Sequence, residues 1–275
     1  MQFRIGFELT YCCPQPTPMI ATLGVHDSRG SDLVSTDQLI TQPTLALCGY
    51  RDGFGNWCNR LVLPAGRTVL SVDAYINDSG LPDPVDLAAQ QHAVQELPEE
   101  TLVFLLGSRY CETDRFYELA WQHFGHVPAG WSRVQAISNF VHQHIAFGYE
   151  HANPSKTAWQ VYQEKRGVCR DYAHLAITFC RCLNMPARYC TGYLGDVGTP
   201  QPWSAGDFAG WFEVYLGGQW HTFDPRNNTR RIGRVLMARG RDAADVAITT
   251  SFGPATLESF KVWMDEVPQA SALVG

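Results

Sequence analysis

Gly167-Val168-Cys169-Arg170-Asp171-Tyr172-Ala173-His174 is the stretch of sequence that decides the fold. It places Cys169 where a loop becomes a helix, because the apolar residues that follow recur with the spacing of one helix face. About forty residues later, two alternating runs flank Gly217-Gly218 and predict a β-hairpin over residues 209–216 and 219–223, with Asp224 just beyond it. A cysteine at a helix start and an aspartate at the end of a hairpin are two parts of a Cys-His-Asp acyl-transfer site.

The position of Cys169 has a chemical meaning. The first turn of a helix leaves backbone N–H groups without partners, and the helix dipole is positive there. Both effects favour a nucleophilic thiolate, and the same N–H groups can hold the oxyanion of an attacked carbonyl. The competing interpretation is a small buried core residue, and position alone does not decide between the two.

The rest of the chain divides into a β-rich and a helix-rich part. Residues 3–11 alternate in polarity, and turn residues separate short strand-like runs up to about residue 100, which is typical of a sandwich. Helical patterns follow over residues 115–124 and from Trp131 onward. Gly167 is expected to end a short helix before Cys169 opens the next one, which Pro186 stops.

Several motifs in this order resemble the transglutaminase-like superfamily of papain-type α+β proteins, and most of all its bacterial branch of transglutaminase-like cysteine proteases. The motifs lie at residues 52–56 (Asp-Gly-Phe-Gly-Asn), 108–114, 167–176, 185–189, 192–193 and 240–247. The resemblance implies an α+β fold. An N-terminal β-sandwich-like domain over residues 1–100 would precede a papain/transglutaminase-like core over residues 101–275, whose cysteine-bearing helix packs on an antiparallel sheet.

The catalytic triad of that family carries over only in part. Its nucleophile matches Cys169 and its aspartate matches Asp224, but Ala209 occupies the position of its histidine. If Gly217-Gly218 is the turn, Trp211 lies opposite Asp224, so position 209 shares the face of Asp224, as a triad requires.

Other residues are weak substitutes for the missing base. His221 would lie opposite Val214 on the other face of the hairpin, and only a bulge would reverse that parity. His174 lies five residues beyond Cys169 on the helix, which favours a packing role. Glu213 shares the face of Ala209, but a paired strand residue is the simpler interpretation. The more distant histidines, which could reach the site only through the fold, are His142, His144 and His151.

Two functions follow from the resemblance and from the missing histidine. The first is a cysteine protease or amidase that acts on a peptide or protein through a Cys169 thioester, with hydrolysis favoured over crosslinking. The second is a catalytically impaired or inactive homologue that binds a peptide or protein partner in the same cleft. A third explanation of Ala209 is an alanine introduced to trap an inactive form, and the sequence does not exclude it.

Composition narrows the choice of partners and compartment. The net charge of −6 and the scattered basic residues disfavour binding to nucleic acid, and no apolar run has the length of a membrane span. The nine cysteines lack metal-ligand or disulfide-framework spacing, and no leader is visible, so we expect free thiols in the cytoplasm. No cofactor and no metal is expected, and the sequence leaves the substrate and the oligomeric state open.

Overall fold

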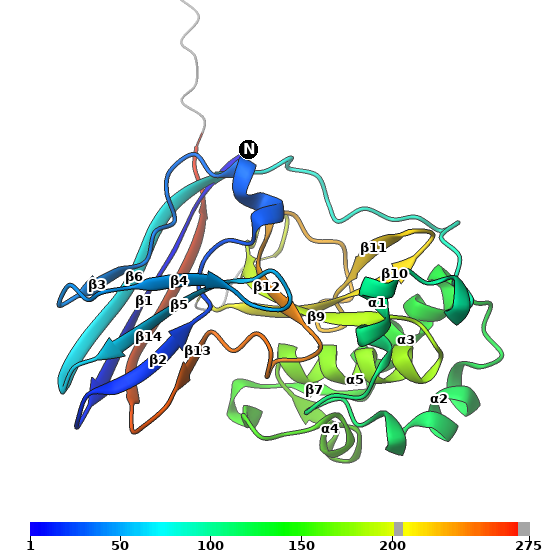
Figure 1. Ribbon diagram of the computed structural model, residues 1–275. Helices are drawn as coiled ribbons and strands as arrows, with labels where there is room; N and C mark the ends of the chain where they lie inside the picture. The colour runs from blue at the N-terminus through cyan, green and yellow to red at the C-terminus, as the bar shows by residue number, and fades with distance from the viewer. Residues whose placement is uncertain (201–205, 269–275) are drawn as a thin grey trace, which may run out of the picture.

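The first sheet is built around strand β1 (Gln2–Cys13) in the computed structural model, which describes residues 1–200 and 206–268. The strand order is β14 (Thr256–Glu266), β1, β6 (Gly66–Asn77), β3 (Ile40–Gln42). The second sheet has the order β13 (Thr249–Ser251), β2 (Thr17–Ala21), β5 (Trp57–Leu63), β4 (Cys48–Arg51). Side chains of both sheets share one apolar core, so the predicted sandwich is confirmed (Figure 1).

The C-terminal strands return to this sandwich. β14 pairs along the whole of β1 from Phe3 to Cys12, and β13 pairs with β2. Figure 1 shows the orange-red β14 beside the dark blue β1. The predicted core domain over residues 101–275 therefore does not describe this arrangement, because β13 and β14 belong to the sandwich. β14 supplies the hydrogen bonds that one edge of β1 would otherwise leave open.

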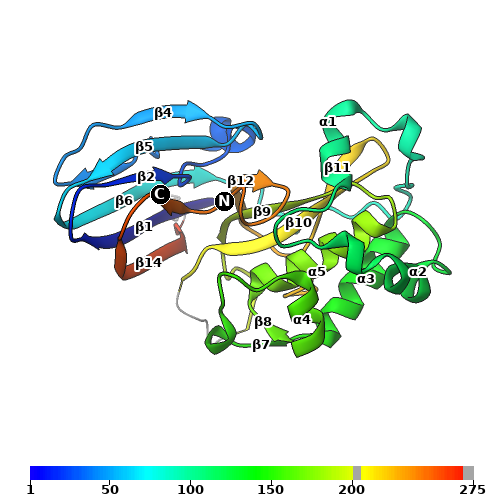
Figure 2. The same cartoon turned by 60° about the horizontal axis from the view of Figure 1, so that its bottom comes forward.

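The second part of the molecule is a sheet covered by helices. The strand order is β11 (Gln219–Phe223), β10 (Ala209–Leu216), β9 (Ala187–Leu194), β12 (Arg234–Gly240), all antiparallel. The helices are α2 (Tyr117–Phe124), α3 (Trp131–His144), α4 (Ala158–Glu164) and α5 (Cys169–Cys182), with α5 packed on β9 and β10 (Figure 2). The predicted α+β core, with a cysteine-bearing helix on an antiparallel sheet, is therefore confirmed.

Helix α5 begins at Cys169, as the sequence predicts. Every residue from Asp171 to Cys182 is buried, so the helix is the central element of its half of the molecule. The carboxylate of Asp171 accepts a hydrogen bond from the backbone N–H of Val168 at 2.9 Å, which fixes the turn into the helix. The position of the thiol is thus set by a fully packed element rather than by a loop.

The segment before α5 differs from the prediction. The short helix α4 ends at Glu164, because Lys165 adopts a left-handed backbone with a φ of 56°. Gly167 does not end that helix. It belongs to the two-residue strand β8 (Arg166–Gly167), which pairs in parallel with β7 (Ala146–Phe147). The remaining short elements are η1 (Asp27–Asp32), η2 (Val94–Glu96), α1 (Glu99–Leu102), η3 (Val103–Leu105), η4 (Thr113–Arg115) and η5 (Tyr149–His151).

A buried asparagine joins the sandwich to the core. Asn56 is fully buried, donates to the carbonyl of Arg239 on β12 at 2.8 Å and accepts from the N–H of the same residue at 2.9 Å. Asp52 holds the turn before it by accepting hydrogen bonds from the N–H groups of Phe54 and Asn56. The motif at residues 52–56 therefore serves the contact between the two parts of the molecule.

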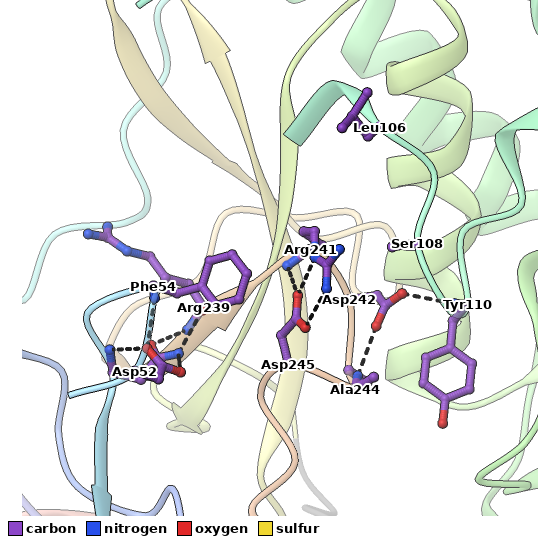
Figure 3. A network of polar contacts seen from close by, with 12 residues as sticks. Asp52, Phe54, Leu106, Ser108, Tyr110, Arg239, Arg241, Asp242, Ala244 and Asp245 are labelled. Carbon is purple, nitrogen blue, oxygen red and sulfur yellow. Dashed lines mark hydrogen bonds and ion pairs between the residues drawn. The ribbon is translucent and has the colours of Figure 1, made fainter. Parts of the chain in front are cut away.

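Arg181, in the last turn of α5, links this helix to three other segments by hydrogen bonds. Its buried guanidinium donates to the hydroxyl of Ser108 and to the carbonyls of Leu106, Ala187 and Arg241. Asp242 accepts from the backbone N–H groups of Tyr110 and Ala244 beside it (Figure 3). The motifs at residues 108–114 and 240–247 thus anchor the same helix that carries Cys169.

Candidate active site

Cys169 lines a cavity between the start of α5, the start of β10 and the loop after β11. The cavity is also lined by Phe147, Tyr149, Leu194, Asp196, Gly206, Asp207, Phe208, Ala209, Gly210, Arg226, Asn227 and Arg231. Three segments that are far apart in the sequence therefore meet at the thiol. Among the described residues that line the cavity there is no histidine.

Glycine at position 210 lets β10 approach the start of α5. A Cβ atom there would lie 2.4 Å from the hydroxyl oxygen of Tyr189 and 3.4 Å from the backbone nitrogen of Arg170. The backbone of Gly210 also makes a hydrogen bond with the Cys169 thiol, as does the backbone of Arg170. Two backbone donors therefore act on the sulfur, which is the arrangement expected where negative charge develops.

The thiol nevertheless has a raised pKa. Cys169 is partly buried, and this burial raises the pKa of its thiol to about 11, with the negative charges of Asp207 and Asp224 acting in the same direction. The two backbone hydrogen bonds lower the pKa but do not outweigh burial. The helix position by itself predicts a lower pKa, and the sign is reversed here because desolvation is the larger effect. At neutral pH the cysteine is held as the protonated thiol.

Asp207 is the acidic group whose charge acts most strongly on Cys169. Burial raises the pKa of the Asp207 carboxyl, while a backbone hydrogen bond at Phe208, a hydrogen bond with the Tyr149 side chain and the charge of Arg226 lower it. Tyr149 lies at the rim of the cavity, where 50% of its surface is exposed. The cavity therefore contains a desolvated carboxyl beside a desolvated thiol.

Asp224 is bound by other residues. One carboxylate oxygen accepts from the backbone N–H of Asn227 at 3.1 Å, and the other accepts from the Asn227 amide at 2.7 Å and from Arg234 at 3.2 Å. Arg234 also pairs with Asp83 at 3.0 Å, and its guanidinium stacks on the ring of Trp211. The carboxylate of Asp224 is thus committed to an arginine and an asparagine. Its triad role stays a prediction.

The hairpin has the predicted register. Leu216 pairs with Gln219, Val214 with His221, and Phe212 with Phe223, so Trp211 and Asp224 come next. Ala209 opens β10 and lines the same cavity as Cys169, and its match to the family histidine stays a prediction. No bulge interrupts this ladder, so His221 remains on the opposite face.

The weak substitutes are all engaged elsewhere. His174 is fully buried, stacks on Tyr110 with ring centres 5.1 Å apart, and accepts from the backbone N–H of Ala243. Burial holds the pKa of His174 well below its usual value, so the ring is neutral and serves packing. His221 contacts the carbonyl of Leu216.

Glu213 and the distant histidines are likewise outside the cavity. Glu213 forms an ion pair with Arg188 at 2.6 Å. His142 and His144 bind the carbonyls of Pro225 and Tyr162, respectively. The Nε2 atom of His151 lies 3.6 Å from Oε1 of Glu150. None of these side chains is among the described residues around Cys169.

Two comparisons identify the fold family. The sequence profile of the transglutaminase-like superfamily core matches residues 120–225. The crystal structure of a putative cysteine protease from Cytophaga hutchinsonii is similar over 98% of this chain and 92% of that chain, with 29% identity and a TM-score of 0.82. Residues 120–225 therefore have the transglutaminase-like superfamily core, and the chain shares the fold of that crystal structure.

Two further comparisons cover less of this chain or show lower similarity. An uncharacterized protein from Mycobacterium leprae is 35% identical over 88 residues, which is 30% of each chain. The periplasmic domain of TgpA from Pseudomonas aeruginosa is 14% identical, with a TM-score of 0.41 over 82% of this chain and 90% of that chain. Within the described residues, no helix has the length and apolar character needed to cross a membrane.

The sequence prediction missed the polar residues that surround the thiol. Asp207, Arg226 and Asn227 line the cavity with Cys169, yet none was predicted as part of the site. A signal was available for Asp207, because it lies two residues before Ala209 and strand alternation puts such residues on one face. For Arg226 and Asn227, which follow the hairpin, no comparable pattern exists.

Proposed function

We propose that this transglutaminase-like protein transfers acyl groups from peptides or other amides through a thioester at Cys169, with water as the acceptor. The observation that carries the proposal is the thiol at the first residue of α5, in a cavity where the backbone at Arg170 and Gly210 contacts the sulfur. Such donors stabilise the negative charge that develops on sulfur and oxygen during attack. The nine free cysteines support a cytoplasmic location as part of the same proposal.

The reaction is expected to be slow. The thiol of Cys169 is protonated at neutral pH because its pKa is raised to about 11, and no imidazole lines the described cavity to remove its proton. Loss of the base in a catalytic triad costs several orders of magnitude in rate, while binding and oxyanion contacts leave a residual activity. A hydrolase that uses Cys169 would therefore favour activated or tightly bound acyl groups.

A second function, peptide or protein binding without turnover, is favoured by Ala209 and by the state of Asp224. The carboxylate of Asp224 is bound by Asn227 and Arg234 and so is not free to orient a base. The same cavity could then hold an acyl group or side chain without chemistry.

The test is acylation of Cys169 by p-nitrophenyl acetate, followed by mass spectrometry of the peptide that contains it. The native protein should carry an acetyl group on Cys169, and Cys169→Ala should lose this acetyl group together with the part of the nitrophenol release that it accounts for. The matched control is Cys48→Ala, since Cys48 is exposed and remote from the cavity. Equal nitrophenol release from the native protein and Cys169→Ala would contradict the thioester and leave the binding function.

A further inference from the structure

Of the carboxyl groups that line the described cavity, Asp207 is the one whose charge acts on Cys169. Asp207 lines this cavity with Cys169 and Ala209, and lies two residues before the alanine that replaces the family histidine. Among the charged groups, Asp207 has the largest effect on the thiol. The other carboxylate that acts on the thiol belongs to Asp224, and its oxygens are taken by Asn227 and Arg234.

Asp207 is itself held by a neighbour. The side chain of Tyr149, from the segment after β7, makes a hydrogen bond with its carboxylate. A nucleophile, a carboxylate and a third group that orients the carboxylate repeat the logic of a catalytic triad. Here the three members are Cys169, Asp207 and Tyr149.

We propose that Asp207 takes the place of the missing histidine as proton acceptor and donor for Cys169, with Tyr149 as its positioning residue. The inference rests on the thioester function proposed above and names the group that makes it possible. It assigns no role to Asp224 in proton transfer.

The proton balance of the reaction closes with these two groups. As the sulfur of Cys169 attacks the acyl carbon, the thiol proton moves to the carboxylate of Asp207. Asp207 then gives this proton to the leaving amine when the carbon–nitrogen bond breaks and the thioester remains. In the second half, Asp207 accepts a proton from the attacking water, the carbon–sulfur bond breaks, and the proton returns to the sulfur as the acid leaves.

The surroundings suit Asp207 for both halves of this cycle. Burial raises the pKa of its carboxyl, so the group gives up a proton less readily than an exposed aspartic acid and accepts one more readily. The remaining charged groups of the cavity are Asp196, Arg226 and Arg231. Arg231 pairs with Asp196 at 3.3 Å, and Arg226 limits the rise in the pKa of Asp207.

The inference predicts opposite effects of one substitution on two properties of the same thiol. Asp207→Asn removes a negative charge that raises the pKa of Cys169, so iodoacetamide should label Cys169 faster at about pH 9 than in the native protein. The same variant should be acylated by p-nitrophenyl acetate about 10²-fold more slowly at neutral pH, because it lacks the proton acceptor. Asp207→Glu, which keeps a carboxylate, should recover part of the acylation rate.

The experiment measures both rates at Cys169 by mass spectrometry in the full-length native protein, Asp207→Asn, Asp207→Glu and Asp114→Asn. Asp114 is exposed and lies outside the cavity, so its variant controls for the same chemical change. Tyr149→Phe should lower acylation less than Asp207→Asn and should shift the pH profile of acylation, since it changes the pKa of Asp207 but keeps the carboxylate.

The outcomes distinguish the role of Asp207 from the thioester at Cys169. Slower acylation with faster labelling in Asp207→Asn supports proton transfer by Asp207. Acylation that is unchanged, or that rises in parallel with labelling, would overturn the role of Asp207 while leaving the thioester in place. A native protein that is never acylated at Cys169 would overturn the proposed function, and this inference with it.

Discussion

The two ends of helix α5 are built in opposite ways. At the C-terminal end, Arg181 is buried, and its guanidinium donates to three carbonyls and a hydroxyl. At the N-terminal end, Cys169 and the nearby Asp207 are partly buried, and the loss of water around them raises the pKa of both groups. One end of the helix therefore carries a buried cation with several acceptors, and the other carries a thiol whose hydrogen bonds do not make up for the lost water.

The difference between the two ends of α5 suggests that one end serves stability and the other serves reactivity. Buried polar groups with complete hydrogen bonds rigidify a structure and are costly to remove. Groups with perturbed pKa values in a cavity are instead typical of functional sites. The Arg181 end holds the helix in place, and the Cys169 end is left in a state that can react.

The largest expected effect is on stability and comes from removing the guanidinium of Arg181 at the C-terminal end of α5. Arg181→Met leaves the carbonyls of Leu106, Ala187 and Arg241 without their donor in the protein interior. The free energy of unfolding should fall by about 3–5 kcal/mol, measured by urea unfolding followed by tryptophan fluorescence. Arg115→Met is the control, because Arg115 is half-exposed and its ion pair with Glu112 is long, so its change should stay within about 0.5 kcal/mol. Equal stability of Arg181→Met and the native protein would contradict the comparison.

The second largest effect is expected from a substitution that places a base beside Cys169. Ala209→His places an imidazole at the position that lines the cavity beside Cys169. Acylation of Cys169 at neutral pH should rise by about 10²-fold, a common contribution of one general base, measured by the p-nitrophenyl acetate reaction. Asp207→Asn should then matter less in the Ala209→His background, because the imidazole takes over the proton.

Ala209→Gln is the matched control for this substitution, since it fills the cavity without a group that titrates near neutral pH. It should leave the acylation rate at or below that of the native protein. A gain shared by Ala209→Gln would point to a packing effect and not to a base.

The smallest effect concerns the pH dependence of stability. The folded-state pKa of Asp207 is raised above its unfolded value, so folding favours the protonated carboxyl. The stability that this group contributes is full below the unfolded pKa of about 3.9 and is lost as the pH rises through the folded pKa. Asp207→Asn should therefore melt at a higher temperature than the native protein near neutral pH, and this difference should shrink on acidification. Melting curves against pH test this, with Asp114→Asn as baseline, and a difference that grows toward low pH would reverse the sign assigned to Asp207.

Local patterns in the sequence were sufficient for the elements around the site. The spacing of apolar residues and the Gly217-Gly218 turn predicted where α5 begins and how β10 and β11 pair, residue by residue. These features depend on neighbours in the chain. Where the prediction was wrong, at Gly167, a pairing with the distant residue Phe147 had replaced a helix end.

The sequence by itself determined the family, the helix that carries Cys169 and the absence of a histidine at position 209, because each depends on residue identity and short-range spacing. Only the tertiary structure decided the rest. The return of β14 to β1 joins segments far apart in the chain, and the folding of the loop after β11 brings Arg234 onto the carboxylate of Asp224. The pKa values of Cys169 and Asp207 depend on how much water the folded chain excludes from the cavity, and no local pattern encodes that quantity.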